Sequence, residues 1–152
     1  MFHEPAARFE RRLIDSLYAE ALLLADDTRD YFDGSGRAER DSLAPLERVS
    51  LSCESLRVTT RLMHIIAWLL TQRAVLAGEL APSDALDGTR RLGESPASDP
   101  VALARLPERA KALALASARL HDRVAQLDSA QVSAVPPASP ARVMMERLAG
   151  AF

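Results

Sequence analysis

Apolar residues recur every three or four positions along most of the chain, which is the spacing of amphipathic α-helices. No segment alternates apolar and polar residues as a half-buried β-strand does. The pattern predicts a first helix over residues 6–32, which Gly34 and Gly36 then end. Its apolar stripe consists of Phe9, Leu13, Leu17, Ala21, Leu24, Thr28 and Tyr31. The chain is therefore expected to be all-α.

A second helix is predicted over residues 43–77. Pro45 is tolerated in its first turn, and Gly78 and Pro82 close it. At 1.5 Å per residue this helix would be about 50 Å long. A helix of that length in a chain of 152 residues is typical of the spine of a bundle.

Residues 78–99 are rich in glycine and proline and are expected to connect the second helix to a third. Asp99 followed by Pro100 has the pattern of an N-cap and a first helical position. Pro107 predicts a kink or a restart in this third helix. Its apolar seam alternates spacings of four and three and consists of Leu106, Ala110, Leu113, Ser117, Leu120, Val124 and Leu127. Such a seam predicts packing against the other two helices.

The last part of the chain, residues 129–152, begins with a run of serine, alanine and proline that cannot form a core. We therefore expect a three-helix bundle over residues 1–128, with its connector at 78–99, and a flexible tail over 129–152. Helical spacing returns at Met144, Met145 and Leu148. This short amphipathic end is either a frayed terminus without a role or an element that folds onto an apolar groove of a partner.

The second helix carries apolar residues around well over half of its circumference, where an ordinary amphipathic helix covers little more than about 100°. One face, interpreted as the bundle core, consists of Val49, Cys53, Leu56, Thr60, Met63, Ile66, Ala67, Leu70 and Ala74. A second face consists of Leu51, Val58, Leu62, Ile65, Leu69 and Leu76. Because two neighbouring helices can cover the first face, the second predicts a homodimer. The alternative is that the first and third helices splay and cover both faces.

The third face of this helix is polar and contains the only tryptophan of the chain. It consists of Glu54, Arg57, Arg61, His64, Trp68 and Gln72. Tryptophan beside arginine is typical of partner-binding surfaces, so these six residues form a candidate docking arc. The alternative is that Trp68 packs under the connector or the third helix while the arginines remain solvated.

Composition and charge narrow the classes of function. The 19 basic and 21 acidic residues are intermixed and leave a net charge of −2, which favours neither nucleic acid nor an acidic membrane as a partner. A single cysteine suits a reducing compartment, and Cys53 is expected to be buried. The N-terminus has no apolar signal segment, and the longest apolar run is far shorter than the ~20 residues of a membrane span. A cytoplasmic protein is expected.

The sequence offers no catalytic or metal-binding pattern. The three histidines lack the spacing of metal ligands, and no nucleophile has a base near it in sequence. His64 could in principle accept a phosphoryl group, but the residues that follow it are apolar rather than those of phosphotransfer proteins. We therefore expect no enzyme activity and no cofactor.

Two stretches resemble one family of proteins. Residues 17–37, LYAEALLLADDTRDYFDGSGR, and residues 52–80, SCESLRVTTRLMHIIAWLLTQRAVLAGEL, are similar to the regulator-of-CtrA-degradation, or RcdA-like, family of alphaproteobacteria. Residues 107–127 resemble it more weakly. The resemblance implies a dimerising three-helix domain with a flexible tail. It also implies a non-enzymatic adaptor of the ClpXP protease that works with a priming response-regulator adaptor and delivers cell-cycle transcription regulators for degradation.

Two other classes of function stay open at this stage. The first is a helical interaction or scaffold protein of the same fold with a different partner. The second is a phosphotransfer or ligand-binding bundle.

Overall fold

The computed structural model describes residues 4–134 and 140–151, and every regular element within them is helical. The first helix, α1, spans Glu4–Asp30 and continues into a π-helical turn, η1, over Tyr31–Ser35. The short helix α2 (Arg37–Asp41) leads to the long helix α3 (Pro45–Leu76). The connector contains α4 (Pro82–Ala85) and the 3-10 turn η2 (Gly88–Arg90). Then come α5 (Pro100–Ala104), α6 (Glu108–Ser133) and α7 (Pro140–Ala149).

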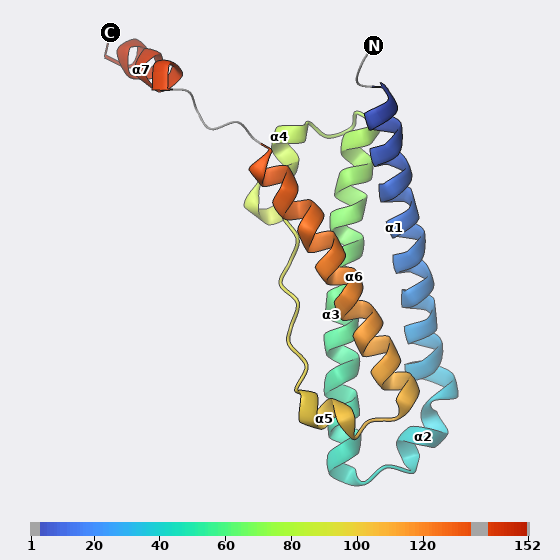
Figure 1. Cartoon of the computed structure of the whole chain (residues 1–152). Helices are drawn as coiled ribbons and strands as arrows, with labels where there is room; N and C mark the ends of the chain where they lie inside the picture. The colour runs from blue at the N-terminus through green and yellow to red at the C-terminus, as the bar shows by residue number, and fades with distance from the viewer. Residues whose placement is uncertain (1–3, 135–139, 152) are drawn as a thin grey trace.

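Three long helices form the body of the protein (Figure 1). Helix α3 runs antiparallel to α1, and the connector then returns the chain along the bundle, so that α6 runs in the same direction as α3. This confirms the predicted all-α bundle with a long central helix. Helix α7 lies apart from the body (Figure 1).

Local signals place the helix ends where the sequence predicts them. Gly78 has a φ of +75°, a backbone conformation that closes α3 and that favours glycine. The side chain of Asp99 accepts a hydrogen bond from the backbone N–H of Val101 at 3.0 Å and so caps α5. Pro107 separates α5 from α6, which makes it a restart rather than a kink.

The end of α6 differs from the prediction. The helix continues to Ser133, and Asp128 is buried within it. The predicted boundary between bundle and tail, after residue 128, therefore falls inside α6. The buried ion pair described below explains the extension, because it gives this last part of the helix a polar anchor on the body.

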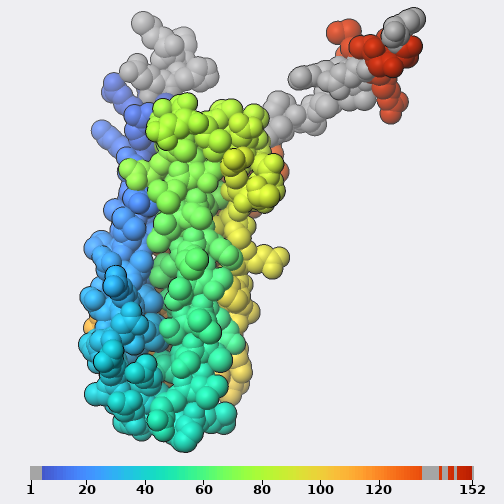
Figure 2. Space-filling view, turned by 180° about the vertical axis from the view of Figure 1, so that it is seen from behind, coloured from blue at the N-terminus to red at the C-terminus, as the bar shows by residue number. Residues whose placement is uncertain are grey.

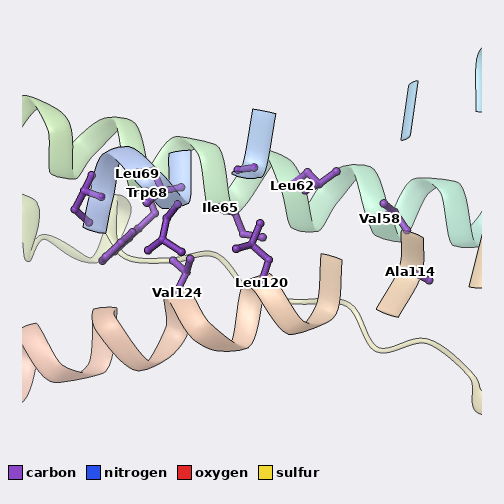
Figure 3. Close-up of a cluster of buried hydrophobic side chains, with 11 residues drawn as sticks. Val58, Leu62, Ile65, Trp68, Leu69, Ala114, Leu120 and Val124 are labelled. Atoms are coloured by element: carbon purple, nitrogen blue, oxygen red, sulfur yellow. The ribbon is translucent and has the colours of Figure 1, made fainter. Parts of the chain in front are cut away.

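The core fills the space between the three long helices. Its larger cluster consists of Ile14, Leu17 and Ala21 from α1, Val58, Leu62, Ile65, Trp68 and Leu69 from α3, and Ala114, Leu120 and Val124 from α6 (Figure 3). A smaller cluster at the α2 end contains Tyr31, Leu51, Leu106, Ala110 and Leu113. The predicted seam of the third helix is thus confirmed as its buried face.

Gly36 lets the chain turn tightly against Tyr31 at this end of the bundle. A Cβ atom at Gly36 would lie 2.5 Å from the backbone oxygen of Tyr31, so a side chain has no room there. The buried phenol of Tyr31 donates a hydrogen bond to Glu39 Oε2 at 2.7 Å. This bond ties the π-helical turn to α2.

Candidate functional site

The predicted docking arc on α3 lies beneath the connector rather than on the surface. Four of its six side chains are buried, namely Glu54, Arg61, Trp68 and Gln72, while Arg57 and His64 are half-buried. The arc is therefore not an open docking surface in this structure. The alternative interpretation placed Trp68 under the third helix and left the arginines solvated. It is confirmed for Trp68, which is buried against α6. It is wrong for Arg61, which is buried as well.

Arg61 anchors the connector to α3. Its guanidinium donates hydrogen bonds to the Oγ atoms of Ser95 (3.0 Å) and Ser98 (2.7 Å) and to the backbone oxygen of Pro96 (2.7 Å). It also donates to Ser117 Oγ on α6 at 3.3 Å. A buried guanidinium requires several acceptors to offset its lost hydration, and here the connector supplies most of them.

Glu54 supplies the counter-charge for this cation. Its Oε1 lies 3.6 Å from Arg61 Nη1 and also accepts a hydrogen bond from Ser98. Its other oxygen accepts from Arg57 Nη1 at 3.1 Å. One buried carboxylate thus holds two arginines of α3 and one serine of the connector.

A second polar anchor lies closer to the C-terminal end of α3, at Trp68. Asp128 on α6 accepts a hydrogen bond from Trp68 Nε1 at 3.0 Å and a two-pronged pair from Arg91, each at 2.7 Å. Burial alone would raise the pKa of Asp128, but hydrogen bonds from Arg91 and Trp68 and the charge of Arg91 outweigh it and hold this pKa below its usual range. The hydrogen bonds that Arg91 donates to Asp128 raise the pKa of the Arg91 guanidinium in turn. The three residues join α3, the connector and α6.

Two histidines hold the backbone of the connector between these anchors. His64 Nδ1 lies 2.9 Å from the backbone oxygen of Glu94, and His121 Nε2 lies 2.8 Å from that of Gly93. Within residues 4–134 and 140–151, no group of three or more His, Cys, Asp or Glu side chains could hold a metal ion. Both histidines therefore act in this structure as hydrogen-bonding partners of the connector.

The predicted dimer face is the core of the protomer. Leu51, Val58, Leu62, Ile65 and Leu69 are all buried, and Leu76 packs against the same cluster. These residues cannot meet a second copy without unfolding the bundle, so their assignment to a dimer face is wrong. The first and third helices cover this face, which is the alternative that the sequence left open.

The face predicted to form the core is instead exposed. Four of its large members are open to solvent, with exposed fractions of 59% for Val49, 68% for Leu56, 65% for Met63 and 46% for Leu70. Ile66 is the exception, since it is half-buried and packs against the core. Cys53, expected to be buried, is exposed as well. Seen from behind, α3 forms a ridge between α1 and the connector (Figure 2). Apart from Ile66, the sequence pattern separates the two apolar faces of α3, but it assigns the core and the exposed face the wrong way round.

A shallow groove of about 280 Å³ runs beside this exposed face, between α1 and α3. Ala25 lines it from α1 and Phe32 from η1. Met63 and Ile66 line it from α3. Arg29 and Asp33 are exposed residues of its lining and carry opposite charges.

The predicted tail element forms α7. Its three apolar residues are exposed, with fractions of 67% for Met144, 71% for Met145 and 55% for Leu148. Among the helices of the described ranges, none combines the length and the hydropathy that a membrane crossing needs.

Comparisons with known proteins agree with this architecture. A family model described as "Protein of unknown function (DUF1465)" matches residues 6–152. The crystal structure of RcdA from Caulobacter crescentus CB15 is 34% identical in sequence, with a TM-score of 0.65 over 78% of this chain and 90% of that chain. A search of curated proteins found no match. The chain therefore belongs to the DUF1465 family, and in sequence and fold it is an RcdA-like protein.

Proposed function

We propose that this protein is a non-enzymatic adaptor that promotes ClpXP-dependent proteolysis of cell-cycle transcription regulators in the cytoplasm. The observation that carries the proposal is the match to RcdA, at 34% identity over 78% of this chain. The RcdA-like family works with a priming response-regulator adaptor, so the proposed partners are ClpX, that adaptor and the cargo. The proposal requires no cofactor.

The surfaces of the protein suit such a role. An adaptor has to hold several partners at once, and it does so with a rigid body and separate docking elements. The connector is fastened to α3 and α6 by Arg61 and Asp128, which makes the body rigid. The exposed face of α3 and the exposed residues of α7 are two separate apolar surfaces. Docking to two partners is the simplest use of two such surfaces in one chain.

The proposal includes a homodimer, as the family resemblance implies. The second copy has to use a surface other than the buried leucines of α3. It also leaves the arc of Arg61 and Trp68 in its structural role, because those side chains are committed to the connector.

The test is the rate at which purified ClpXP degrades a fluorescently labelled cell-cycle regulator in the presence of the priming adaptor. The reaction is run without this protein, with the full chain, and with a chain that ends at Ala134. This end point keeps all of α6, including the buried Asp128. Acceleration by the full chain supports the adaptor function. No acceleration contradicts it and favours a scaffold protein with another partner.

A tail variant separates the role of α7 from that of the body. Met144→Asp/Met145→Asp/Leu148→Asp removes the apolar residues of α7, which are exposed and leave the core untouched. The matched control adds the same three charges at exposed positions of α6, with Ser129→Asp/Ala130→Asp/Ser133→Asp. If α7 docks on a partner, the tail variant loses acceleration and the control keeps it. Equal acceleration by both variants would place the docking site on the body.

A further inference from the structure

A hollow of about 400 Å³ lies between α3 and the part of the connector that precedes Ser95. Helix α3 lines it with His64, Ala67, Trp68 and Thr71, and the connector lines it with residues 88–94. Small-molecule sites in proteins typically measure about 300–1,000 Å³. The volume of this hollow is therefore that of a site for a small molecule.

Arg91 and His64 hold nitrogen atoms in fixed positions on the wall of the hollow. Arg91 binds Asp128 through Nε and Nη2, so Nη1 is the nitrogen that remains for another acceptor. Nδ1 of His64 lies 2.9 Å from the backbone oxygen of Glu94, and because a carbonyl oxygen only accepts, Nδ1 carries the hydrogen of this bond. The bond fixes the ring and leaves Nε2 for another partner.

Both of these nitrogen atoms reach solvent. Within residues 4–134 and 140–151, the only buried side-chain nitrogen or oxygen without a hydrogen-bond partner is Nε2 of Gln72, so Arg91 Nη1 and His64 Nε2 are not buried. Arg90 is a third basic residue of the wall and is exposed. Its Nη1 donates to the backbone oxygen of Asp84 at 3.4 Å, which is long for a hydrogen bond. The Arg90 guanidinium is therefore available to a stronger acceptor.

Two threonines of the wall can accept hydrogen bonds. The hydroxyl of Thr71 donates to the backbone oxygen of Ala67 at 3.1 Å. The hydroxyl of Thr89 donates to Asp87 Oδ1 at 2.7 Å. Because each hydroxyl has one hydrogen, its oxygen can only accept from a further partner. A ligand that matches the wall therefore combines a strong acceptor group for the arginines with hydroxyl groups for the threonines.

We propose that this hollow binds a sugar phosphate. A phosphate monoester carries about 1.5 to 2 negative charges at neutral pH and three strong acceptor oxygens, which guanidinium groups bind with charge-assisted hydrogen bonds. Arg90 and Nη1 of Arg91 are the donors for the phosphate, and Nε2 of His64 is a third donor when the ring is protonated. The hydroxyls of the sugar donate to Thr71 and Thr89. The inference goes beyond the proposed function, which requires no ligand.

The acidic residues near the hollow do not block an anion. Asp128 is bonded to Arg91, and Asp87 is bonded to Thr89, so both carboxylates already have hydrogen-bond donors. Glu94 is exposed, so water and salt screen its charge. Direct charge-assisted hydrogen bonds from two guanidinium groups are stronger than such screened repulsion.

An NMR titration of the full chain tests the ligand, with the Cε1–H resonance of His64 as the probe. The resonance is assigned from its absence in His64→Ala, and pH and ionic strength are held constant. Ribose 5-phosphate should shift it saturably and should bind about tenfold more tightly than inorganic phosphate, because the sugar hydroxyls add hydrogen bonds. Ribose without phosphate is the matched ligand control and should cause no saturable shift. No saturable shift with ribose 5-phosphate, or equal affinity for inorganic phosphate, would overturn the proposal.

A charge variant tests the site. Arg90→Gln removes one of the two guanidinium groups from an exposed position and should raise the Kd for ribose 5-phosphate by about tenfold. Arg105→Gln is the matched control, because Arg105 is exposed and lies outside the hollow, and it should bind like the wild type. At about ten times the Kd, the ligand should raise the unfolding temperature of the wild type by about 3–6 °C. Equal affinity of Arg90→Gln and wild type would show that the phosphate does not bind in this hollow.

Discussion

Trp68 on α3 and Asp128 on α6 are joined by a buried hydrogen bond of 3.0 Å, although they lie 60 positions apart in the chain. The same carboxylate binds Arg91 of the connector through both of its oxygens. A single side chain near the end of α6 therefore fixes the relative positions of three segments. The stability of the body should depend on it.

Replacing Asp128 by asparagine should lower the free energy of unfolding by about 2–3 kcal/mol, because it removes charge-assisted hydrogen bonds from Arg91. Urea unfolding followed by the fluorescence of Trp68, the only tryptophan, measures the loss. The pKa of Asp128 is lowered in the folded protein, so its contribution is complete above the unfolded value of about 4 and is lost as the pH falls through the folded value. The difference between wild type and Asp128→Asn should therefore shrink under acid conditions. A difference that is independent of pH would contradict the ion pair.

Removing the charge of Arg61 should cost more than removing both charges of its pair. Arg61→Met leaves the carboxylate of Glu54 buried beside the connector with only Arg57 and Ser98 as partners. Breaking a buried pair on one side costs about 3–5 kcal/mol, whereas replacing both partners with neutral groups is often far less harmful. We expect the double variant Glu54→Gln/Arg61→Met to unfold at a higher urea concentration than Arg61→Met alone. Additive losses in this double-mutant cycle would show that the two side chains do not interact.

Tyr31 gives the structure a sensitivity to alkaline pH. Burial, followed by the hydrogen bond to Glu39, raises the pKa of this phenol well above its ordinary value of 10. Folding therefore favours the neutral phenol, and its contribution is complete below pH 10 and declines as the pH rises above it. Tyr31→Phe should lose about 1 kcal/mol of stability at neutral pH, and this loss should diminish above pH 10. Thermal unfolding of the two proteins between pH 8 and pH 11 measures both effects.

The sequence predicts the helices of this protein much better than the contacts between them. Spacing locates α1, α3 and the start of α6 within a few residues, because apolar periodicity and glycine or proline signals are local, whereas the end of α6 lies beyond the predicted boundary. The positions of the apolar residues around α3 also separate its two apolar faces, apart from Ile66. They cannot tell which face is inside, because Glu54, Arg61 and Gln72 make the buried side look polar while Val49, Leu56 and Met63 make the exposed side look like a core. The acceptors that let Arg61 enter the core come from residues 95–98 and 117. These residues lie more than 30 positions away in the chain, so no local sequence pattern predicts their hydrogen bonds to Arg61.

The closeness of the connector to α3 can be tested at Gly93. A Cβ atom at this position would lie 2.5 Å from Nδ1 of the His64 ring, so Gly93→Ala should push the connector away from α3 and weaken the hydrogen bond from His121 to the backbone oxygen of residue 93. We expect a loss of about 1–3 kcal/mol, the usual cost of overpacking a close contact. Gly88→Ala in the same connector is the matched control, because no atom lies within 4 Å of its Cβ position, and it should be nearly neutral. His64→Ala removes the obstructing ring, so the double variant Gly93→Ala/His64→Ala should lose less stability than the sum of the two single variants. If Gly93→Ala proves as harmless as Gly88→Ala, the connector does not lie against His64 in solution.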